Sequence, residues 1–515
     1  MITGTPSDMS NGKLIAKNTV FLYIRMLFIM GITLFTSRVI LAALGISDYG
    51  IYNVVGGLAT SFVFFSSSLS NATQRFLTFA LGKNDIAEVR NVFNLSLLVY
   101  AIIAILVFVI GEIAGMYLIY NHLIIPDDRL PAAIWVFHAT MLSLSVTLVS
   151  TVFDSVLIAR ENMKIYAYIG MLEAVVRLSI AYILKISPTD KLILYATLLL
   201  IFSVLIKTIP VIYCLRQYPE CHIGFFWDKK QFTKMLSFVG WNGLGTFAWT
   251  INEQGVNVLL NMFFGPVVNA ARGVAGQVSA AVNNFSRNFF TAVRPQIVKS
   301  YATEDYSYFV KLIFYSSRFS FFLMWMLCLP ILLRRDYILN LWLKEVPEWS
   351  QIFLVWVLIY SLVNVLTQPT WAAIQAIGEL KHYILIGSGI YLLSFPISYI
   401  FLKLGFSPIL PFQVLVIIRV IYLAIVLQIT RHYVKFSVVD YIKSVLIPIF
   451  FVIIISYAIG CYTNTHLPPS FCGLLEVLCT TTIVILIAVF FAGLTPEERN
   501  FTLTHINNAI KKFKK

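Results

Sequence analysis

The stretch NAARGVAGQVSAAVNNFSRNFFTAVRP runs from Asn269 to Pro295, has no helix-breaking residue before Pro295, and reads as one helix. It is long enough to cross a bilayer, yet it carries Arg272 and Arg287 together with Asn283 and Asn284. Ionisable groups at membrane depth are costly, and they mark a functional site more often than a lipid-facing surface. The rest of the chain decides whether this helix lies in a membrane.

The composition is that of a membrane protein. Of the 515 residues, 59% are hydrophobic and only 12% are charged, whereas soluble domains carry about 25% charged residues. The apolar residues gather into stretches of the length that spans a bilayer, so we expect an all-α integral membrane protein with about 14 transmembrane helices. The expected spans are 19–44, 50–82, 91–120, 131–158, 163–185, 191–215, 234–264, 266–299, 307–333, 350–377, 382–404, 408–431, 440–462 and 471–493.

The distribution of Lys and Arg predicts the orientation. With the N-terminus in the cytoplasm, roughly 22 of these residues fall in cytoplasmic connections and roughly 7 in outer ones, which is the bias of the positive-inside rule. We therefore expect both termini in the cytoplasm, and we attribute the net charge of +14 to topology and to contact with anionic lipid rather than to nucleic-acid binding. No cleaved signal peptide is expected, because residues 1–18 are polar and the first apolar span is too long.

The chain resembles itself at an offset of about 216 residues. NVVGGLAT from Asn53 matches NAARGVAG from Asn269, and KIYAYIG from Lys164 matches KHYILIG from Lys381. Six helices per repeat keep both halves in the same orientation, related by an axis along the membrane normal. We expect a six-helix lobe at 1–216, a second at 217–435, two additional helices at 436–494 and a basic amphipathic cytoplasmic tail at 495–515.

The matched helices of the two repeats both carry a stripe of small and polar residues. Close helix packing explains such a stripe, and a water-filled cavity explains it as well. Packing does not need arginine, so the arginines favour the cavity. The stripes are Asn53, Gly57, Thr60, Phe64, Ser67, Asn71, Arg75 and Thr78 in the first copy, and Asn269, Gly273, Gly276, Ala280, Asn283, Arg287, Thr291 and Arg294 in the second.

Basic residues outnumber acidic ones within the expected helices. This excess predicts a hydrated cavity that attracts anions, since clustered cations concentrate phosphate-bearing ligands and arginine binds phosphate through two hydrogen bonds. The candidate residues for this cationic site are Arg287, Arg318, Arg419, Arg272, Lys207, Arg75 and Asn283.

The acidic residues at membrane depth are candidates for ion coupling. Glu253 is deep and serves either as a protonatable coupling group or as the structural partner of Arg272 or Arg287. Asp154 is a second coupling candidate, with pairing to Arg160 as its alternative. Glu173 and Arg177 are four residues apart on one helix, so we expect them to neutralise each other.

Several classes of chemistry have no support in the sequence. The six cysteines show no Cys-x-x-Cys spacing and no accompanying histidine cluster, so we expect no metal site and no cofactor. No G-x-x-x-x-G-K-[ST] loop is present for an ATP-driven pump. The expected outer loops are too short to hold the catalytic domain of a glycan polymerase or glycosyltransferase.

The order of three short motifs resembles the polysaccharide-transporter branch of the multidrug/oligosaccharidyl-lipid/polysaccharide exporter superfamily. These are LGISDYGIYNVVGG from Leu44, RPQIVKSYA from Arg294 and GELKHY from Gly378. The resemblance implies a flippase of the Wzx type in the bacterial inner membrane, which is a transporter and not an enzyme. It would move undecaprenyl-diphosphate-linked oligosaccharides for O-antigen, capsule or exopolysaccharide assembly.

The same resemblance implies alternating access between two lobes, a cationic lumen that holds the diphosphate, and a gradient of H+ or Na+ as the driving force. Membrane lipids and other polysaccharide assembly proteins are the implied partners. The alternative function is an ion-coupled small-molecule or drug antiporter of the same fold, which the excess of cations opposes.

Overall fold

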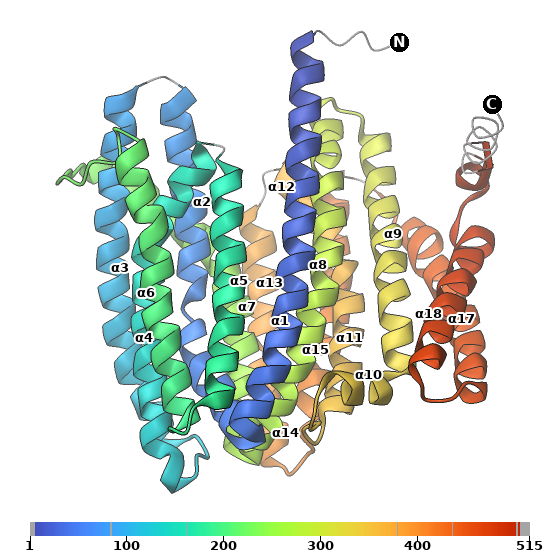
Figure 1. Ribbon diagram of the computed structural model, residues 1–515. Helices are drawn as coiled ribbons and strands as arrows, with labels where there is room; N and C mark the ends of the chain where they lie inside the picture. The colour runs from blue at the N-terminus through green and yellow to red at the C-terminus, as the bar shows by residue number, and fades with distance from the viewer. Residues whose placement is uncertain are drawn as a thin grey trace. The chain divides into compact units, whose positions relative to one another are not determined.

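The computed structural model describes residues 6–82, 85–160, 162–377, 380–434, 436–500 and 503–504. Every regular element in these residues is helical, and none is a strand, which confirms the all-α fold class (Figure 1). Ten helical segments of the described chain are long and apolar enough to cross a membrane. The protein is therefore a multi-pass membrane protein.

The chain divides into two compact units. Unit 1 comprises residues 1–273 and 342–348, and unit 2 comprises residues 274–341 and 349–515. The helix α8 (Pro266–Ala302) begins in unit 1 and continues in unit 2. The predicted division into lobes at 216/217 stays a prediction.

The elements of unit 1 are α1 (Pro6–Thr60), α2 (Val63–Gly82), α3 (Ile86–Asn121), η1 (Asp127–Arg129), α4 (Leu130–Ala159), α5 (Met163–Ile186), α6 (Lys191–Gln217) and α7 (Lys229–Phe264). Those of unit 2 are α9 (Tyr306–Leu333), α10 (Arg335–Trp342, whose last residue belongs to unit 1), α11 (Ser350–Val365), α12 (Gln368–Ile377), α13 (Leu380–Leu392), α14 (Ser394–Lys403), α15 (Leu410–Val434), α16 (Val438–Tyr441), η2 (Ile442–Leu446), α17 (Ile447–His466), α18 (Phe471–Ala488) and η3 (Val489–Gly493).

Some expected helices are continuous and others are broken. The opening stretch forms one helix, α8, which continues through Pro295 to Ala302. Gly45 interrupts α1 with φ 79° and ψ 170°, a conformation that favours glycine, and it marks the expected end of the first span. The expected helix at 50–82 is interrupted at Ser61 and Phe62, where the backbone N–H groups bond to carbonyls three residues earlier, as in a 3₁₀ turn.

Aspartates begin several helices by capping. Asp85, Asp190, Asp228 and Asp305 precede α3, α6, α7 and α9, and each accepts hydrogen bonds from backbone N–H groups of the first helical turn. Such caps satisfy donors that have no partner within the helix. The sequence therefore determines these helix starts locally.

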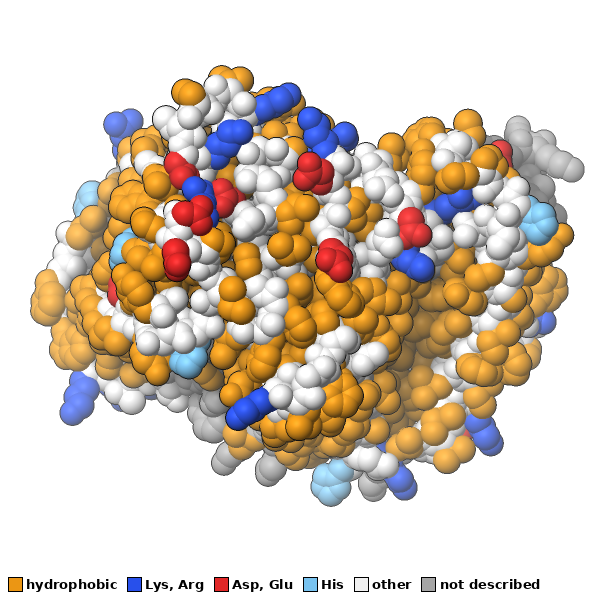
Figure 2. Space-filling view, turned by 90° about the horizontal axis from the view of Figure 1, so that it is seen from below, with side chains coloured by type: hydrophobic (Ala, Val, Ile, Leu, Met, Phe, Trp, Pro, Cys, Tyr) orange, Lys and Arg blue, Asp and Glu red, His pale blue; other side chains and the backbone are white. Residues whose placement is uncertain are grey.

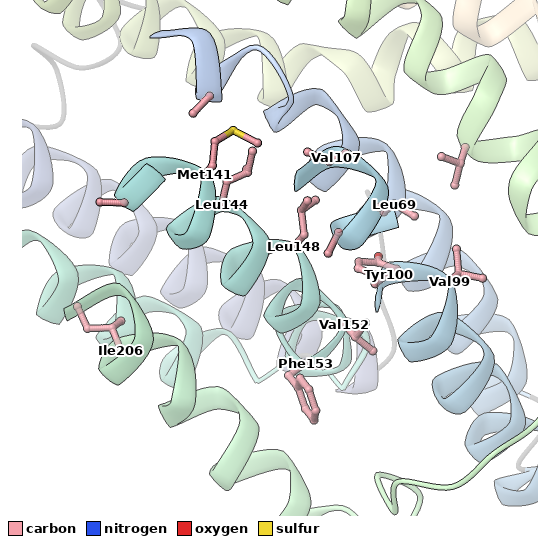
Figure 3. Packing of buried hydrophobic residues seen from close by; sticks show 14 of the residues in the cluster. Leu69, Val99, Tyr100, Val107, Met141, Leu144, Leu148, Val152, Phe153 and Ile206 are labelled. Atoms are coloured by element: carbon pink, nitrogen blue, oxygen red, sulfur yellow. The ribbon is translucent and has the colours of Figure 1, made fainter. Parts of the chain in front are cut away.

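The core of unit 1 is built around α4, which packs against α3, α6 and α2. Figure 3 shows Leu144 and Leu148 of α4 near Val107 and Tyr100 of α3. Gly111 of α3 allows this approach, because a Cβ there would lie 2.2 Å from Cε of Met141. Lipid is as apolar as a protein interior, so small residues and close packing hold such helices together more than removal from water does.

Unit 2 is organised around α9 and α15. α9 packs against α11, α17 and α18, and α15 packs against α11, α13 and α14. Trp325 of α9 donates a hydrogen bond from Nε1 to Oγ of Ser456 on α17 over 2.8 Å. The last two membrane helices of the described chain are thus held on α9.

Candidate functional site

Four asparagines form an amide cluster in unit 1: Asn53, Asn257, Asn261 and Asn269. Asn257 on α7 donates from Nδ2 to the backbone carbonyl of Asn53 on α1 over 2.8 Å. Asn269 on α8 donates from Nδ2 to the backbone carbonyl and to Oδ1 of Asn257, each over 2.7 Å. Three of the four side chains belong to fully or almost fully buried residues, Asn257, Asn261 and Asn269. The bonds therefore join α1, α7 and the first turn of α8.

Glycines let these helices approach one another. A Cβ on Gly50 of α1 would lie 1.9 Å from the backbone oxygen of Pro266, the first residue of α8. A Cβ on Gly57 would lie 2.6 Å from Oε1 of Gln254, and one on Gly273 would lie 2.8 Å from Oδ1 of Asn53. Close approach therefore explains the glycines of the repeated stripe at this end, in accord with the packing alternative.

Asn261 extends the cluster to the connection between α3 and α4. Its Oδ1 accepts a hydrogen bond from the backbone N–H of Ile124 over 2.8 Å, and its Nδ2 donates to the Ile124 carbonyl over 3.4 Å. Both backbone groups of Ile124 are thus satisfied by one side chain. The amide cluster holds this loop as well as the helices.

Glu253 and Arg272 form an ion pair beside the amide cluster. Arg272 Nη2 lies 3.1 Å from Oε2 of Glu253 and donates to the Glu253 backbone carbonyl over 2.7 Å. The side chain of Glu253 is 29% exposed and that of Arg272 is 14% exposed. Within the described residues, Nε of Arg272 is buried and has no hydrogen-bond partner. The structure therefore shows Glu253 in the ion pair with Arg272 that was the alternative to a coupling role, and part of the guanidinium is left unsatisfied.

Sequence reasoning missed Asn257 and Asn261, although a signal was present. Glu253, Asn257 and Asn261 are spaced four residues apart, so they lie on one face of α7. Three polar residues at that spacing in a membrane helix indicate a polar interface. This spacing drew no attention because α7 contains none of the sequence motifs that repeat between the two halves of the chain.

Asp154 and Lys207 lie together in unit 1. Their charged atoms are 3.7 Å apart, and 17% and 18% of the side chains are exposed. Arg160, the expected alternative partner of Asp154, instead pairs with Glu220. The expected pair of Glu173 and Arg177 is confirmed at 2.9 Å.

Arg419 lies on α15 against the break between α11 and α12. Its Nη2 donates to Oδ1 of Asn364 and, over 2.9 Å, to Oγ1 of Thr367. The guanidinium carbon lies 4.7 Å from the ring centroid of Tyr422 and 5.8 Å from that of Tyr391. This arginine is therefore held in a polar and aromatic setting within unit 2.

Arg318 is 2% exposed on α9 and contacts the C-terminal part of the chain. It forms an ion pair with Glu498 through Nη2, and it donates from Nη1 to the carbonyl of Ser444 over 3.1 Å. Glu498 also accepts from the backbone N–H of Thr495 over 2.7 Å, while Thr495 Oγ1 accepts from the N–H of Glu498 over 3.4 Å. Thr495 and Glu498 thus form a reciprocal pair of capping bonds, and Arg318 is bound to the Glu498 carboxylate.

Three other predicted site residues have different positions. Asn283 on α8 donates from Nδ2 to Oγ of Ser279 and of Ser361, each over 3.0 Å. Arg75 is exposed on α2. The side chain of Arg287, and the tail at 505–515, lie outside the described residues.

A charge cluster that the sequence did not single out joins α1 just after its break at Gly45, η1 and the N-cap residue of α6. Arg129 donates to both carboxylate oxygens of Asp48, over 2.8 and 2.6 Å, and to those of Asp190, over 2.6 and 3.3 Å. The hydrogen bond from Arg129 holds the pKa of Asp190 below its usual range. Figure 2 views the lower end in Figure 1, where acidic and basic side chains lie next to one another among hydrophobic ones.

Comparison with solved structures defines the fold. A lipid II flippase, MurJ in an inward closed conformation, matches with a TM-score of 0.67 and 13% identity, covering 91% of this chain and 97% of that chain. A transporter of the MOP superfamily from Pyrococcus furiosus matches with a TM-score of 0.60 and 14% identity over 81% of this chain and 96% of that chain. An inward-facing multidrug resistance MATE family transporter matches with a TM-score of 0.60 and 14% identity over 78% of this chain and 98% of that chain.

No protein-family model and no curated protein matches this chain. The structural matches extend over nearly the whole length of each transporter. The chain shares the fold of these solved transporters.

Proposed function

We propose that this protein is an alternating-access flippase for oligosaccharides linked to undecaprenyl diphosphate. It would act in the bacterial inner membrane, with both termini in the cytoplasm, and supply O-antigen, capsule or exopolysaccharide assembly. Membrane lipids and other polysaccharide assembly proteins are its proposed partners. The Wzx-type resemblance of the sequence and the structural likeness to a lipid II flippase both support this proposal.

The observation that carries the proposal is the state of Arg272. This arginine lies on α8, which the sequence predicts to cross the membrane; it is mostly buried and keeps a buried Nε without a hydrogen-bond partner in the described chain. A guanidinium presents several N–H groups in one plane and binds phosphate through two of them. A diphosphate is therefore a suitable ligand for the part of Arg272 that Glu253 does not satisfy.

The pair also suggests how an ion gradient is coupled to transport. In the present geometry Glu253 neutralises Arg272. A diphosphate that binds Arg272 would compete with the carboxylate, and the released Glu253 would then take up H+ or Na+. Loss of the substrate would restore the ion pair and expel the ion.

In this proposal, the amide cluster holds the helices together at one end of unit 1 and so closes that end to water. Its hydrogen bonds lie between helices and to a loop, so they can separate without unfolding any single helix. Opening would expose the asparagine side chains to water, which replaces their lost partners at little cost.

The remaining predicted ligands stay proposals. Arg419, Lys207, Arg75, Arg287 and Asn283 are proposed contacts to phosphate or sugar, with Asp154 as a second coupling group. The contacts of Arg318 with Glu498 and Ser444 favour a role in holding the C-terminal segment instead.

The test is complementation of a strain that lacks its own flippase, scored for lipid-linked glycan in the inner leaflet. The full chain should relieve the accumulation when its glycan is matched, and Arg272→Gln should not. Arg335→Gln is the control, because Arg335 is 44% exposed outside the membrane core. Normal glycan export by Arg272→Gln would remove Arg272 from the mechanism, and failure with every matched glycan would contradict the flippase.

A small-molecule or drug antiporter is the second candidate, favoured by the likeness to MATE transporters. It predicts that the chain protects a drug-sensitive strain from cationic compounds. The flippase proposal predicts no protection, since a site built on arginine repels cations.

A further inference from the structure

An acid and a histidine outside the site described above meet on the α3–α4 hairpin. Nδ1 of His138 on α4 lies 2.8 Å from Oε2 of Glu112 on α3. Glu112 is nine residues before the end of α3, and His138 is eight residues after the start of α4. At 1.5 Å per residue, both residues lie roughly 13 Å along their helices from the loop that connects α3 to α4, inside the membrane-spanning segments.

The two groups differ in their surroundings. Oε1 of Glu112 is buried and has no hydrogen-bond partner in the described chain. The side chain of His138 is 38% exposed, and it lies on the face of α4 that also exposes Trp135 and Leu142. The imidazole is therefore reachable from outside the bundle, whereas one carboxylate oxygen is enclosed within it.

The other ionisable groups at this depth have contacts of their own. α1 contributes Tyr52 and α6 contributes Tyr195, whose rings meet at 4.8 Å. α5 contributes Arg177, which is paired with Glu173. The ionisable residue of α2, Arg75, lies 13 residues after Phe62, the residue whose ring lies beside Gly111, which is about 20 Å along the helix. In the described chain, the carboxyl group of Glu112 and the ring of His138 are within hydrogen-bond distance of each other and of no other ionisable side chain.

We propose that Glu112 and His138 form a proton-binding site in unit 1. The two side chains can share one proton, either as carboxylate with imidazolium or as the two neutral groups, and the pair then has zero net charge. One further proton gives a carboxylic acid beside an imidazolium, with a net charge of +1. Histidine changes charge in the physiological range, and carboxylate–histidine pairs carry protons in membrane transporters.

Proton binding at this pair has a direct route to the amide cluster. Glu112 and His138 tie the two arms of a hairpin whose connecting loop contains Ile124. Asn261 holds both backbone groups of Ile124. A protonated carboxyl no longer neutralises the ring, so the arms loosen and the loop held by Asn261 is freed to move. This last step rests on the proposed transport function, and proton binding itself does not.

The test is infrared difference spectroscopy of the full chain in vesicles of phosphatidylethanolamine and phosphatidylglycerol, recorded between pH 8 and pH 5. Acidification should produce the carbonyl band of a protonated carboxylic acid, and Glu112→Gln should lack the part that Glu112 contributes. His138→Asn should shift the midpoint of that part by at least one pH unit. Glu476→Gln is the matched control, since Glu476 lies six residues into α18 and is exposed there, and it should retain the Glu112 band.

An unchanged band in Glu112→Gln, or an unmoved midpoint in His138→Asn, would overturn the proton site. A merely structural hydrogen bond predicts both of those results, because glutamine and asparagine still form one. Should Glu112→Gln fail to accumulate in the membrane, the pH dependence of the whole carbonyl band in His138→Asn, compared with that of the unmodified protein, decides alone. The spectra need no transported substrate, so a failed complementation contradicts the flippase without affecting this result.

Discussion

Arg318 on α9 and Glu498, 180 residues later in the chain, form a buried ion pair that fastens the segment after η3 to the middle of unit 2. The same arginine binds the carbonyl of Ser444 in η2, a short π-helix. A second arginine, Arg499, donates to the carbonyls of Phe490 and Phe491 in the other π-helix, η3. Both irregular turns thus have carbonyls that are satisfied by arginine rather than left to lipid.

Breaking the Arg318–Glu498 pair should strongly destabilise unit 2. Arg318→Gln and Glu498→Gln each leave a buried partner without its counter-charge, a change that costs about 3–5 kcal/mol. The double variant should lose less than the sum of the two single losses. Thermal unfolding of the purified protein measures all three, and additive losses would show that the two groups are independent.

The exposed pair of Glu173 and Arg177 provides the comparison. Arg177 is 58% exposed and lies four residues after its partner, so Glu173→Gln should cost only about 0.3–0.5 kcal/mol. An equal loss of stability on breaking either pair would show that burial does not determine what an ion pair contributes in this protein.

Gly50→Ala should open the end of unit 1 that holds the amide cluster. The new Cβ would lie 1.9 Å from a backbone oxygen of Pro266, which cannot rotate away as a side chain could. A cysteine placed at Asn257 should then react faster with a water-soluble maleimide. Gly276→Ala is the control, because a Cβ there would have no packing neighbour within 4 Å beyond its own stretch of helix. Equal reaction rates in both backgrounds would show that this contact does not close the end.

Asn261→Ala should destabilise the α3–α4 loop. It removes the partners that the N–H and the carbonyl of Ile124 have now. Ile124 is 48% exposed, so water can replace them, and the loss should be that of an ordinary hydrogen bond, about 0.5–1.5 kcal/mol. Hydrogen exchange by mass spectrometry should show faster exchange in peptides covering this loop. Asn340→Ala, which removes a bond at an exposed helix surface, should leave that loop unchanged.

Stability at acid pH should depend on Asp190. Its pKa is lowered in the folded protein, mainly by the hydrogen bond from Arg129. The stabilisation is therefore complete above the ordinary carboxylate pKa of about 4 and is lost as the pH falls through the lower folded value. Asp190→Asn should lower the Tm at pH 6, and its Tm should converge with that of the unmodified protein at strongly acid pH.

The effect of Asp190 should be modest. Its side chain is 34% exposed, so the charge interaction is screened and contributes less than about 1 kcal/mol. Asp127→Asn, in the loop next to Arg129, is the matched control. A Tm difference for Asp190→Asn that grows toward acid pH would have the wrong sign for a lowered pKa.

The sequence by itself determined the properties that act along one helix. Hydropathy and length gave the all-α membrane fold, the continuous helix from Pro266 to Ala302 and the local pair of Glu173 and Arg177. The cap at Thr495 was also readable, because its partner is three residues away. These features need no knowledge of neighbouring helices.

Only the tertiary structure decided which polar groups meet. Depth in the membrane marked Arg318 and Glu253 as ionisable residues that need an explanation, but it could not select Glu498 and Arg272 as their partners. Glu112 and His138 likewise come together only when α3 packs on α4. The physical reason is that periodicity fixes the face of a helix on which a residue lies, whereas the facing partner is set by close packing at glycines such as Gly50 and Gly57.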